Sequence, residues 1–193
     1  MRARENPPEL KQFLRENERV LWSSDTEPFP LLASDADIPI LIRWTGTCLV
    51  TIGTLWLYLG SGGSARGVVG AVLLIAAALV LSPIVEYRSL LRQRYWITSQ
   101  RAVMMSADQT LYYLELPELQ KFQVVHSKGG MDCLLLGGAV SEQMKGKMRW
   151  RACHPELREQ KSGQEVQAEG MIFFAVDSVN TAAALLSQCC KAA

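Results

Sequence analysis

The sequence is poor in histidine, with only His126 and His154 among its 193 residues. Nucleophilic and acid–base catalysis usually need a histidine or another tuned base beside a reactive side chain. His126 lies in a segment expected to form a strand, where a surface or sheet-face position is the simpler interpretation. We identify no catalytic residues and expect a protein that is not an enzyme.

The sequence also lacks the spacing of a metal site or a phosphate-binding loop. Cys153 and His154 are adjacent, as two zinc ligands can be, but zinc needs four ligands and no second CxxC or HxxxH is present. The glycine-rich segment 60–63 has neither a Lys-Ser/Thr element nor a preceding strand. We therefore expect no metal and no cofactor.

Neither sign of charge dominates, because 20 Lys and Arg residues face 19 Asp and Glu residues, for a net charge of +1. This balance gives no global field for binding a polyanion, so we expect no nucleic acid partner. The five cysteines are odd in number and irregularly spaced, which is a poor disulfide framework. Those outside the apolar region fit a reducing compartment.

Acidic residues are absent from residues 38–85, and this gap holds two long apolar runs. Residues 38–59 and 67–87 each have the length of a bilayer-crossing helix. The small and polar segment 60–66 between them breaks helix. The alternative is a buried helical hairpin in a soluble protein, but two consecutive runs of this length favour a membrane hairpin. Pro83 predicts a kink near the end of the second span, which membrane helices tolerate.

Basic residues near the ends of the spans predict their orientation. The connecting loop has Arg66 alone, whereas the side of the two termini has Arg43, Arg88, Arg92 and Arg94. Because cytoplasmic flanks are enriched in Lys and Arg, both termini are expected to be cytoplasmic. Trp44, Trp56, Tyr58 and Tyr87 lie at or near the span ends, where aromatic belts form.

Residues 1–37 are predicted to form a cytoplasmic N-terminal region with an amphipathic helix and a connector. Leu10, Phe13 and Leu14 have helical spacing and follow prolines that suit a helix start. A helix resting on the bilayer surface is the alternative. The following "RVLWSS" favours a short strand, and three prolines then lead to the first span.

Residues 88–193 are predicted to form a cytoplasmic domain that opens with a β-hairpin about Ser99–Gln100. Tyr95 and Ile97, then Val103 and Met105, have the period-two spacing of a half-buried sheet. Turn signals separate further expected strands at residues 110–116, 119–127, 131–139, 147–153 and 170–177.

The rest of the region Glu142–Glu169 is charged and is expected to be a long loop. Residues 178–190 then favour a C-terminal helix, with Val179, Ala182 and Leu186 on one apolar face and Asp177 or Ser178 as the cap. The predicted fold is membrane α+β. A two-helix transmembrane hairpin precedes a strongly bent antiparallel sheet or barrel of about seven strands, with the last helix plugging its open end.

Several segments together resemble the bacterial pleckstrin-homology-like (PH-like) domain family of small membrane proteins. They are "ERVLW", the two-span hairpin, "YWITSQR", "LELPELQKFQVVHS", "CLLLGG" and "FFAVDSVNTAAALL", from about Glu18 to the C-terminus. The region Glu142–Glu169 departs from the family by being longer and more polar. The resemblance implies a PH-like fold in the bacterial inner membrane and no reaction. Such folds generally bind proteins, peptides or lipid headgroups.

Two groups of residues are candidate binding sites. Arg92, Arg94 and Arg101 cluster around the first hairpin and are candidates for lipid-headgroup contact. The alternative is that they only set topology at the anionic inner leaflet, and the two-residue turn leaves little room for a headgroup. Arg149, Trp150 and Arg151 combine residue types typical of interaction hot spots, although a solvated edge strand and loop fits them equally well.

The leading functional hypothesis is a non-enzymatic inner-membrane protein whose cytosolic domain binds another protein, as a scaffold or assembly factor. One alternative is a lipid-sensing module using the juxtamembrane arginines, and another is an accessory subunit of a membrane enzyme or transport complex. Small residues including Gly46, Gly53 and Gly67 also offer faces for a homo-oligomer.

Overall fold

The computed structural model describes residues 10, 12–32, 37–63, 65–126, 132–140, 155–162 and 165–192. They belong to two compact units. The hairpin unit comprises Pro30–Arg88, and the sheet unit comprises the described residues up to Phe29 and from Ser89 onward. The segment before the hairpin therefore belongs with the sheet, whereas the sequence suggested a separate N-terminal region.

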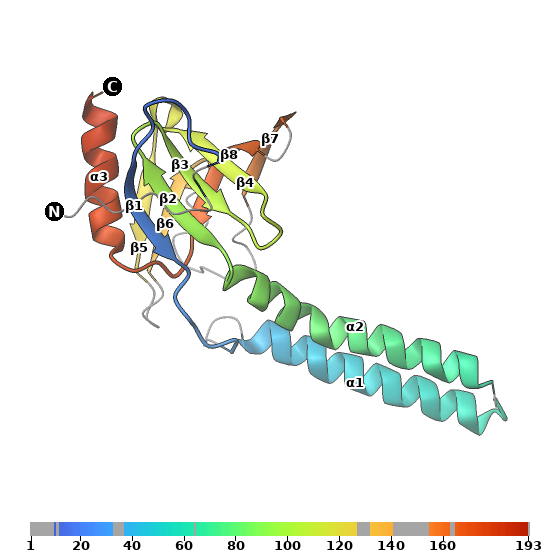
Figure 1. Ribbon diagram of the computed structural model, residues 1–193. Helices are drawn as coiled ribbons and strands as arrows, with labels where there is room; N and C mark the ends of the chain where they lie inside the picture. The colour runs from blue at the N-terminus through green and yellow to red at the C-terminus, as the bar shows by residue number, and fades with distance from the viewer. Residues whose placement is uncertain are drawn as a thin grey trace. The chain divides into compact units, whose positions relative to one another are not determined.

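The hairpin unit consists of α1 (Asp37–Gly60) and α2 (Arg66–Leu90), which run side by side in Figure 1. The two predicted spans are thus confirmed as helices, and α2 continues as helix through Pro83 to Leu90. By length and composition, both helices are apolar enough to cross a membrane.

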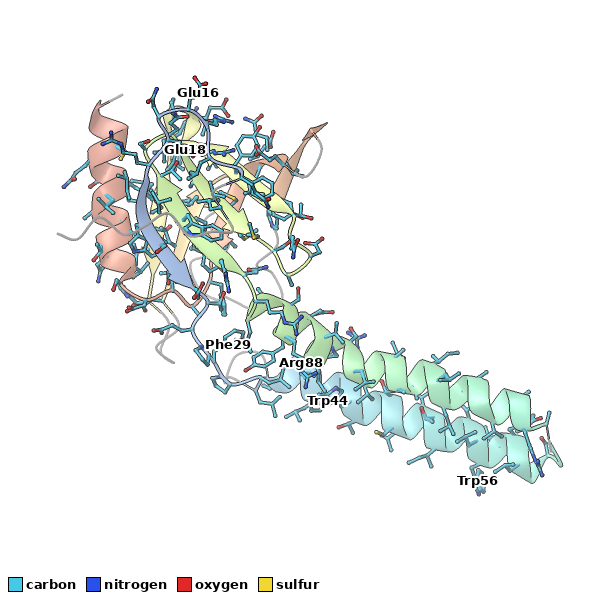
Figure 2. All side chains as sticks on the ribbon, viewed as in Figure 1. Glu16, Glu18, Phe29, Trp44, Trp56 and Arg88 are labelled. Carbon is cyan, nitrogen blue, oxygen red and sulfur yellow. The ribbon has the colours of Figure 1, made fainter. Side chains whose placement is uncertain are left out.

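The outer surface of the hairpin unit is apolar. In the described part of the chain, all but two of the exposed large apolar side chains, Leu21 and Leu32, lie on α1 or α2. Trp56 is the most exposed of them, at 75%, and Figure 2 shows its side chain pointing away from the helix pair.

The sheet unit is built on one curled sheet (Figure 1). Its strands are β1 (Val20–Asp25), β2 (Arg94–Thr98), β3 (Arg101–Met105), β4 (Leu111–Glu115), β5 (Phe122–Val125), β6 (Cys133–Gly137), β7 (Glu156–Ser162) and β8 (Glu165–Phe173). The strand order is β1-β2-β3-β4-β8-β6-β5, with β7 pairing β8 outside this path. A short 3₁₀ helix, η1 (Leu116–Glu118), follows β4.

The topology corrects the predicted antiparallel meander. Strands β1 to β4 do form a meander with antiparallel pairs, but β4 pairs β8 in parallel, so the sheet is mixed. The expected long loop within Glu142–Glu169 is also wrong in part, because β7 and the start of β8 form an antiparallel pair there. A charged composition does not distinguish a strand from a loop, which is why the prediction from composition was wrong here. The expected strand at 147–153 lies outside the described residues.

The concave side of the sheet holds the main core. Trp22, Tyr95 and Phe173 stack there: the ring centroids of Trp22 and Phe173 are 6.2 Å apart, and those of Tyr95 and Phe173 are 4.7 Å apart. The C-terminal helix α3 (Val179–Ala192) contributes its predicted apolar face, including Ala182 and Leu186, to the same core. The expected C-terminal helix is therefore confirmed.

A second, smaller core covers the other face of β2 and β3. Trp96 and Val103 pack there with Leu10, which has no exposed surface, and Phe13 and Leu14 lie against this cluster. These three residues are the ones whose spacing predicted an amphipathic helix. The described backbone before β1 instead forms turns, with a positive φ of 63° at Asn17, so the helix prediction is wrong for these residues.

The most consequential pairing joins β1 to β2. These strands flank the hairpin unit in the sequence, yet they pair antiparallel with Asp25 opposite Arg94. Beyond this pair, the backbone N–H of Thr26 donates to the carbonyl of Gln93 (3.3 Å), and the Thr26 hydroxyl bonds the Tyr95 hydroxyl (3.2 Å). The chain therefore leaves the sheet for the hairpin and returns to it at the same point.

Candidate functional site

Arg101, the first residue of β3, is completely buried, which is unusual for an arginine. Its position follows from the hairpin: the Thr98 hydroxyl accepts a hydrogen bond from the backbone N–H of Arg101 (3.0 Å) and fixes the turn. A buried guanidinium is tolerated only when paired and hydrogen-bonded. The sheet unit supplies such partners from two separate chain segments, the one before the hairpin unit and the start of β8.

The first partner is Glu18, which is 5% exposed and comes from the segment before the hairpin unit. Arg101 binds it through two nitrogens, with Nε 3.0 Å from Oε1 and Nη2 3.2 Å from Oε2. The Thr98 hydroxyl donates to Glu18 Oε1 (2.7 Å), and the backbone N–H of Arg15 donates to Oε2 (2.8 Å). The carboxylate is therefore fully engaged.

The remaining partners extend the network to β8 and to the small core. Arg101 Nη1 lies 3.0 Å from Glu165 Oε2, and Nη2 donates to the Phe13 carbonyl. The Tyr113 ring lies 5.2 Å from the Arg101 guanidinium and 5.4 Å from that of Arg15. We call Glu18, Thr98, Arg101, Tyr113 and Glu165 the Arg101 network.

The environment of this network keeps Glu18 ionised and Arg101 protonated. Burial by itself raises the pKa of Glu18, but hydrogen bonds from Arg101, Arg15 and Thr98 more than offset it, so the pKa lies below its usual value. Burial likewise opposes the charge of Arg101, yet Glu18 and Glu165 raise its pKa. The network is an ion pair at neutral pH.

This geometry corrects one of the predicted sites. Arg101 was expected among the lipid-headgroup contacts, but its guanidinium is enclosed and bound to two carboxylates, so it cannot meet a headgroup in this structure. Its role is architectural, because it ties β3 to the chain segment before the hairpin unit and to the start of β8. The charge of Arg101 suggested a surface position. Its partners Glu18 and Glu165, which are distant in the sequence, show that it is buried instead.

The depressed pKa of Glu18 predicts a pH dependence of stability. A carboxylate whose pKa is lower in the folded state adds stability above its unfolded pKa, and this stability is lost as pH falls through the folded value. Between about pH 7 and pH 3, the Glu18→Gln variant should therefore lose less stability than the natural protein, measured by denaturant unfolding at each pH. The control is Glu16→Gln, a change at an exposed position nearby (Figure 2), and its free energy of unfolding should fall with pH as that of the natural protein does. An equal pH dependence of the free energy of unfolding in all three proteins would contradict this role of Glu18.

Arg92 and Arg94 lie together, without Arg101, in a groove of about 480 Å³. Gln12, Ser106 and Gln109 also line it. Arg92 is exposed, whereas Arg94 Nε lies 3.5 Å from a carboxylate oxygen of Asp25. The groove is therefore only weakly positive. We call it the arginine groove.

A second groove, of about 720 Å³, lies between β1 and the first turn of α3. We call it the β1 groove. Its lining includes Ser24, Asp25, Glu27, Asp177 and Thr181, together with two tryptophans, Trp22 and Trp96. Sequence reasoning missed it, because its two walls lie about 150 residues apart in the chain and are brought together by long-range contacts such as the pairing of Thr26 with Val176.

The other predicted candidates give no site among the described residues. Arg149, Trp150 and Arg151 lie outside them, as do Cys153 and His154. His126 is exposed, as expected, with Nδ1 3.1 Å from Asp132 Oδ2. Burial raises the pKa of Cys133 to about 11, which keeps this thiol protonated and unreactive at neutral pH. Over the described part of the chain, no group of three His, Cys, Asp or Glu side chains could hold a metal ion.

Within the hairpin unit, polar side chains bridge the two helices near one end. Trp44 Nε1 donates to the carbonyl of Val80 (3.0 Å), and Arg43 Nη2 donates to Ser82 Oγ (3.4 Å). Gly46 and Gly53, which we predicted to form contact faces, have open space where a Cβ would lie, so neither glycine is needed for the packing of α1 against α2.

No family model, curated protein or solved structure matches this chain. The resemblance to PH-like domains therefore rests on the sequence segments quoted above.

Proposed function

We propose that this chain is an integral membrane protein whose hairpin unit crosses the inner membrane twice. Its sheet unit is a non-enzymatic, PH-like module that binds another protein at the cytoplasmic surface, as a scaffold or assembly factor. The observation that carries the membrane proposal is the exposed apolar surface of α1 and α2. In water this surface would be a large aggregation liability, whereas lipid accommodates it.

The pairing of β1 with β2 supports the proposed orientation. The two strands that flank the hairpin unit belong to one sheet, so the bilayer cannot separate them. An even number of crossings satisfies this constraint, and the hairpin has two candidate spans. The basic residues Arg88 and Arg92 on the same side favour the cytoplasm.

Protein binding is supported by the form of the sheet unit. Among the described strands, β1 and β5 end the main strand order and β7 lies outside it, and a groove runs beside β1. Strand edges and grooves beside helices are common sites of peptide recognition. The buried charges of the Arg101 network are occupied within the fold, so they are not offered to a substrate.

The arginine groove favours a second candidate function, the sensing of anionic lipid. Arg92 follows the last residue of α2 by two positions, which keeps it within a few ångströms of the end of the proposed span. Each basic residue near an anionic surface is worth about 1 kcal/mol. Asp25 offsets part of this attraction at Arg94, so we rank lipid sensing below protein binding.

Photo-cross-linking in native membranes tests the two candidates together. A photoreactive residue at the exposed Leu21 of β1, or at Thr181 of α3, should give a protein adduct of one reproducible size. The same residue at Arg92 should give lipid adducts if lipid sensing is the function. Trp56 serves as the control that labels lipid through the span. Protein adducts at neither sheet position would contradict the scaffold proposal.

A further inference from the structure

A groove of about 450 Å³ runs between α1 and α2 within the hairpin unit. We call it the hairpin groove. Along α1 it extends from Arg43, near one end, to Thr54 at the other, which is about 16 Å at a rise of about 1.5 Å per residue. Its lining consists mainly of small and apolar residues, including Gly46, Thr47, Val50, Thr51, Val72 and Ala76.

The interior of the hairpin groove favours an apolar ligand. The Thr47 hydroxyl donates to the Arg43 carbonyl (2.7 Å), and the Thr51 hydroxyl donates to the Thr47 carbonyl (2.7 Å). Both hydroxyl protons are thus used within α1, so neither can be donated to a ligand. Ile75 and Leu79 of α2 line the other wall. A polar molecule would lose its hydrogen bonds to water in this interior, which costs free energy.

The dimensions of the groove distinguish an acyl chain from a helix. A volume of about 450 Å³ over about 16 Å gives a mean width of about 6 Å. A helix with its side chains is about 10–12 Å across, so it is too wide to enter. An alkyl chain fits, because its carbon atoms pack about 4 Å from their neighbours. The length is also close to half of the hydrocarbon core of a bilayer, which is about 15 Å.

Arg43 lies at the end of the groove that the proposed topology places at the cytoplasmic surface. It is half-buried and is the fourth residue of the candidate span Ile40–Gly60. Its neighbour Trp44 lies at the same end of the helix pair as Arg88, whereas Trp56 lies toward the other end (Figure 2). A long basic side chain at this depth reaches the headgroup layer of the inner leaflet.

The charge at this end suits a phosphate group. A guanidinium can donate to two phosphate oxygens at once. Arg43 Nη2 donates to Ser82 Oγ over 3.4 Å, a long hydrogen bond that a phosphate oxygen can replace. Ser82 in turn donates to Glu86 Oε1 (3.1 Å), which brings a negative charge close to the site. The site should therefore select the phosphate and not the total negative charge of a headgroup.

We propose that the hairpin groove holds one phospholipid of the inner leaflet, with one acyl chain between α1 and α2 and the phosphate on Arg43. The groove and the guanidinium together distinguish this lipid from the lipid that surrounds any membrane helix. It should therefore exchange more slowly than its neighbours. This inference rests on the proposed crossing of the membrane and adds a ligand to it.

Native mass spectrometry of the full chain in mild detergent tests for this lipid. The delipidated protein is offered phosphatidylethanolamine, phosphatidylglycerol or diacylglycerol, all with the same acyl chains. Each phospholipid should give a one-to-one adduct that survives removal of the detergent, and the two should bind equally within about threefold. Diacylglycerol should bind at least about tenfold more weakly, because it has no phosphate to accept charge-assisted hydrogen bonds from Arg43.

Two variants with matched controls locate the site. Gly46→Leu places a side chain in the open space of the groove and should weaken the adduct at least about tenfold, because a packed groove has no room for both. Gly53→Leu is its control, since Gly53 has the same open space but lies outside the lining of the groove. Arg43→Gln should weaken phospholipid binding about tenfold and leave diacylglycerol binding unchanged. Arg88→Gln, at an exposed position, should change neither.

Three results would overturn the inference: a strong preference for phosphatidylglycerol over phosphatidylethanolamine, an unchanged adduct in Gly46→Leu, or an equal loss in Gly53→Leu. Unchanged helical circular dichroism shows that the variants are folded. If no adduct survives while the topology of the hairpin in cells still shows two crossings, the membrane proposal stands and only the lipid assignment falls.

Discussion

Replacing Pro30–Arg88 with a short Gly/Ser linker should convert this chain into a water-soluble, folded protein. The chain leaves and re-enters the sheet at one point, with the Thr26 N–H 3.3 Å from the Gln93 carbonyl oxygen, so a few residues can close the gap. The sheet unit keeps both of its cores after this replacement. We expect a monomer with a single cooperative unfolding transition, measured by circular dichroism and size-exclusion chromatography.

The matched control is a chain that starts at Arg88, the boundary that the sequence suggested for the cytoplasmic domain. It lacks β1, Glu18 and Leu10, so it removes an edge strand, leaves the Arg101–Glu18 pair broken and uncovers Trp96. This chain should aggregate or show no cooperative transition. Equal stability of the two proteins would contradict the view that the segment before the hairpin is an integral part of the sheet unit.

Arg101→Ala should be the most damaging single substitution in the sheet unit. Breaking a buried ion pair by removing one partner typically costs about 3–5 kcal/mol, because the other charge stays buried without compensation. Here Glu18 would be left at 5% exposure with only Thr98 and the Arg15 N–H as donors. Denaturant unfolding of the linker-closed protein, or of the full chain in detergent, gives the free energy.

Arg15→Ala is the control, because Arg15 pairs with Glu115 (2.7 Å) at side-chain exposures of 41% and 23%. Such a pair is worth up to about 1 kcal/mol. The double change of Arg101 and Glu18 to methionine should recover much of the loss, since no unpaired charge remains between them. If Arg101→Ala costs no more than Arg15→Ala, the Arg101 network does not stabilise the sheet unit.

The sequence predicted the elements whose signal is local. The two apolar helices, the strand at Val20–Asp25, the hairpin about Ser99–Gln100 and the helix at Val179–Ala192 all follow from periodicity and turn residues. In each case the residues that specify the element are neighbours in the chain.

The errors concern contacts between distant segments. The parallel pairing of β4 with β8 joins residues about 54 positions apart (Leu111 with Glu165), and no local pattern encodes it. Leu10, Phe13 and Leu14 do form an apolar cluster, but they cover Trp96 from a turn instead of from a helix. Arg101 is buried because Glu18 and Glu165 meet it there. The β1 groove was missed for the same reason, because its walls come from segments that are distant in the sequence.

The most direct test of the account is the topology of the hairpin in intact cells. Green fluorescent protein fused to either end should fluoresce, because it folds only in the cytoplasm, and alkaline phosphatase at either end should be inactive. A cysteine in place of the loop residue Ser61 should react with a membrane-impermeant maleimide from outside, in a chain whose own cysteines are replaced. Labelling of Ser61→Cys only after the cells are broken, or active phosphatase at either terminus, would contradict two crossings with both ends inside.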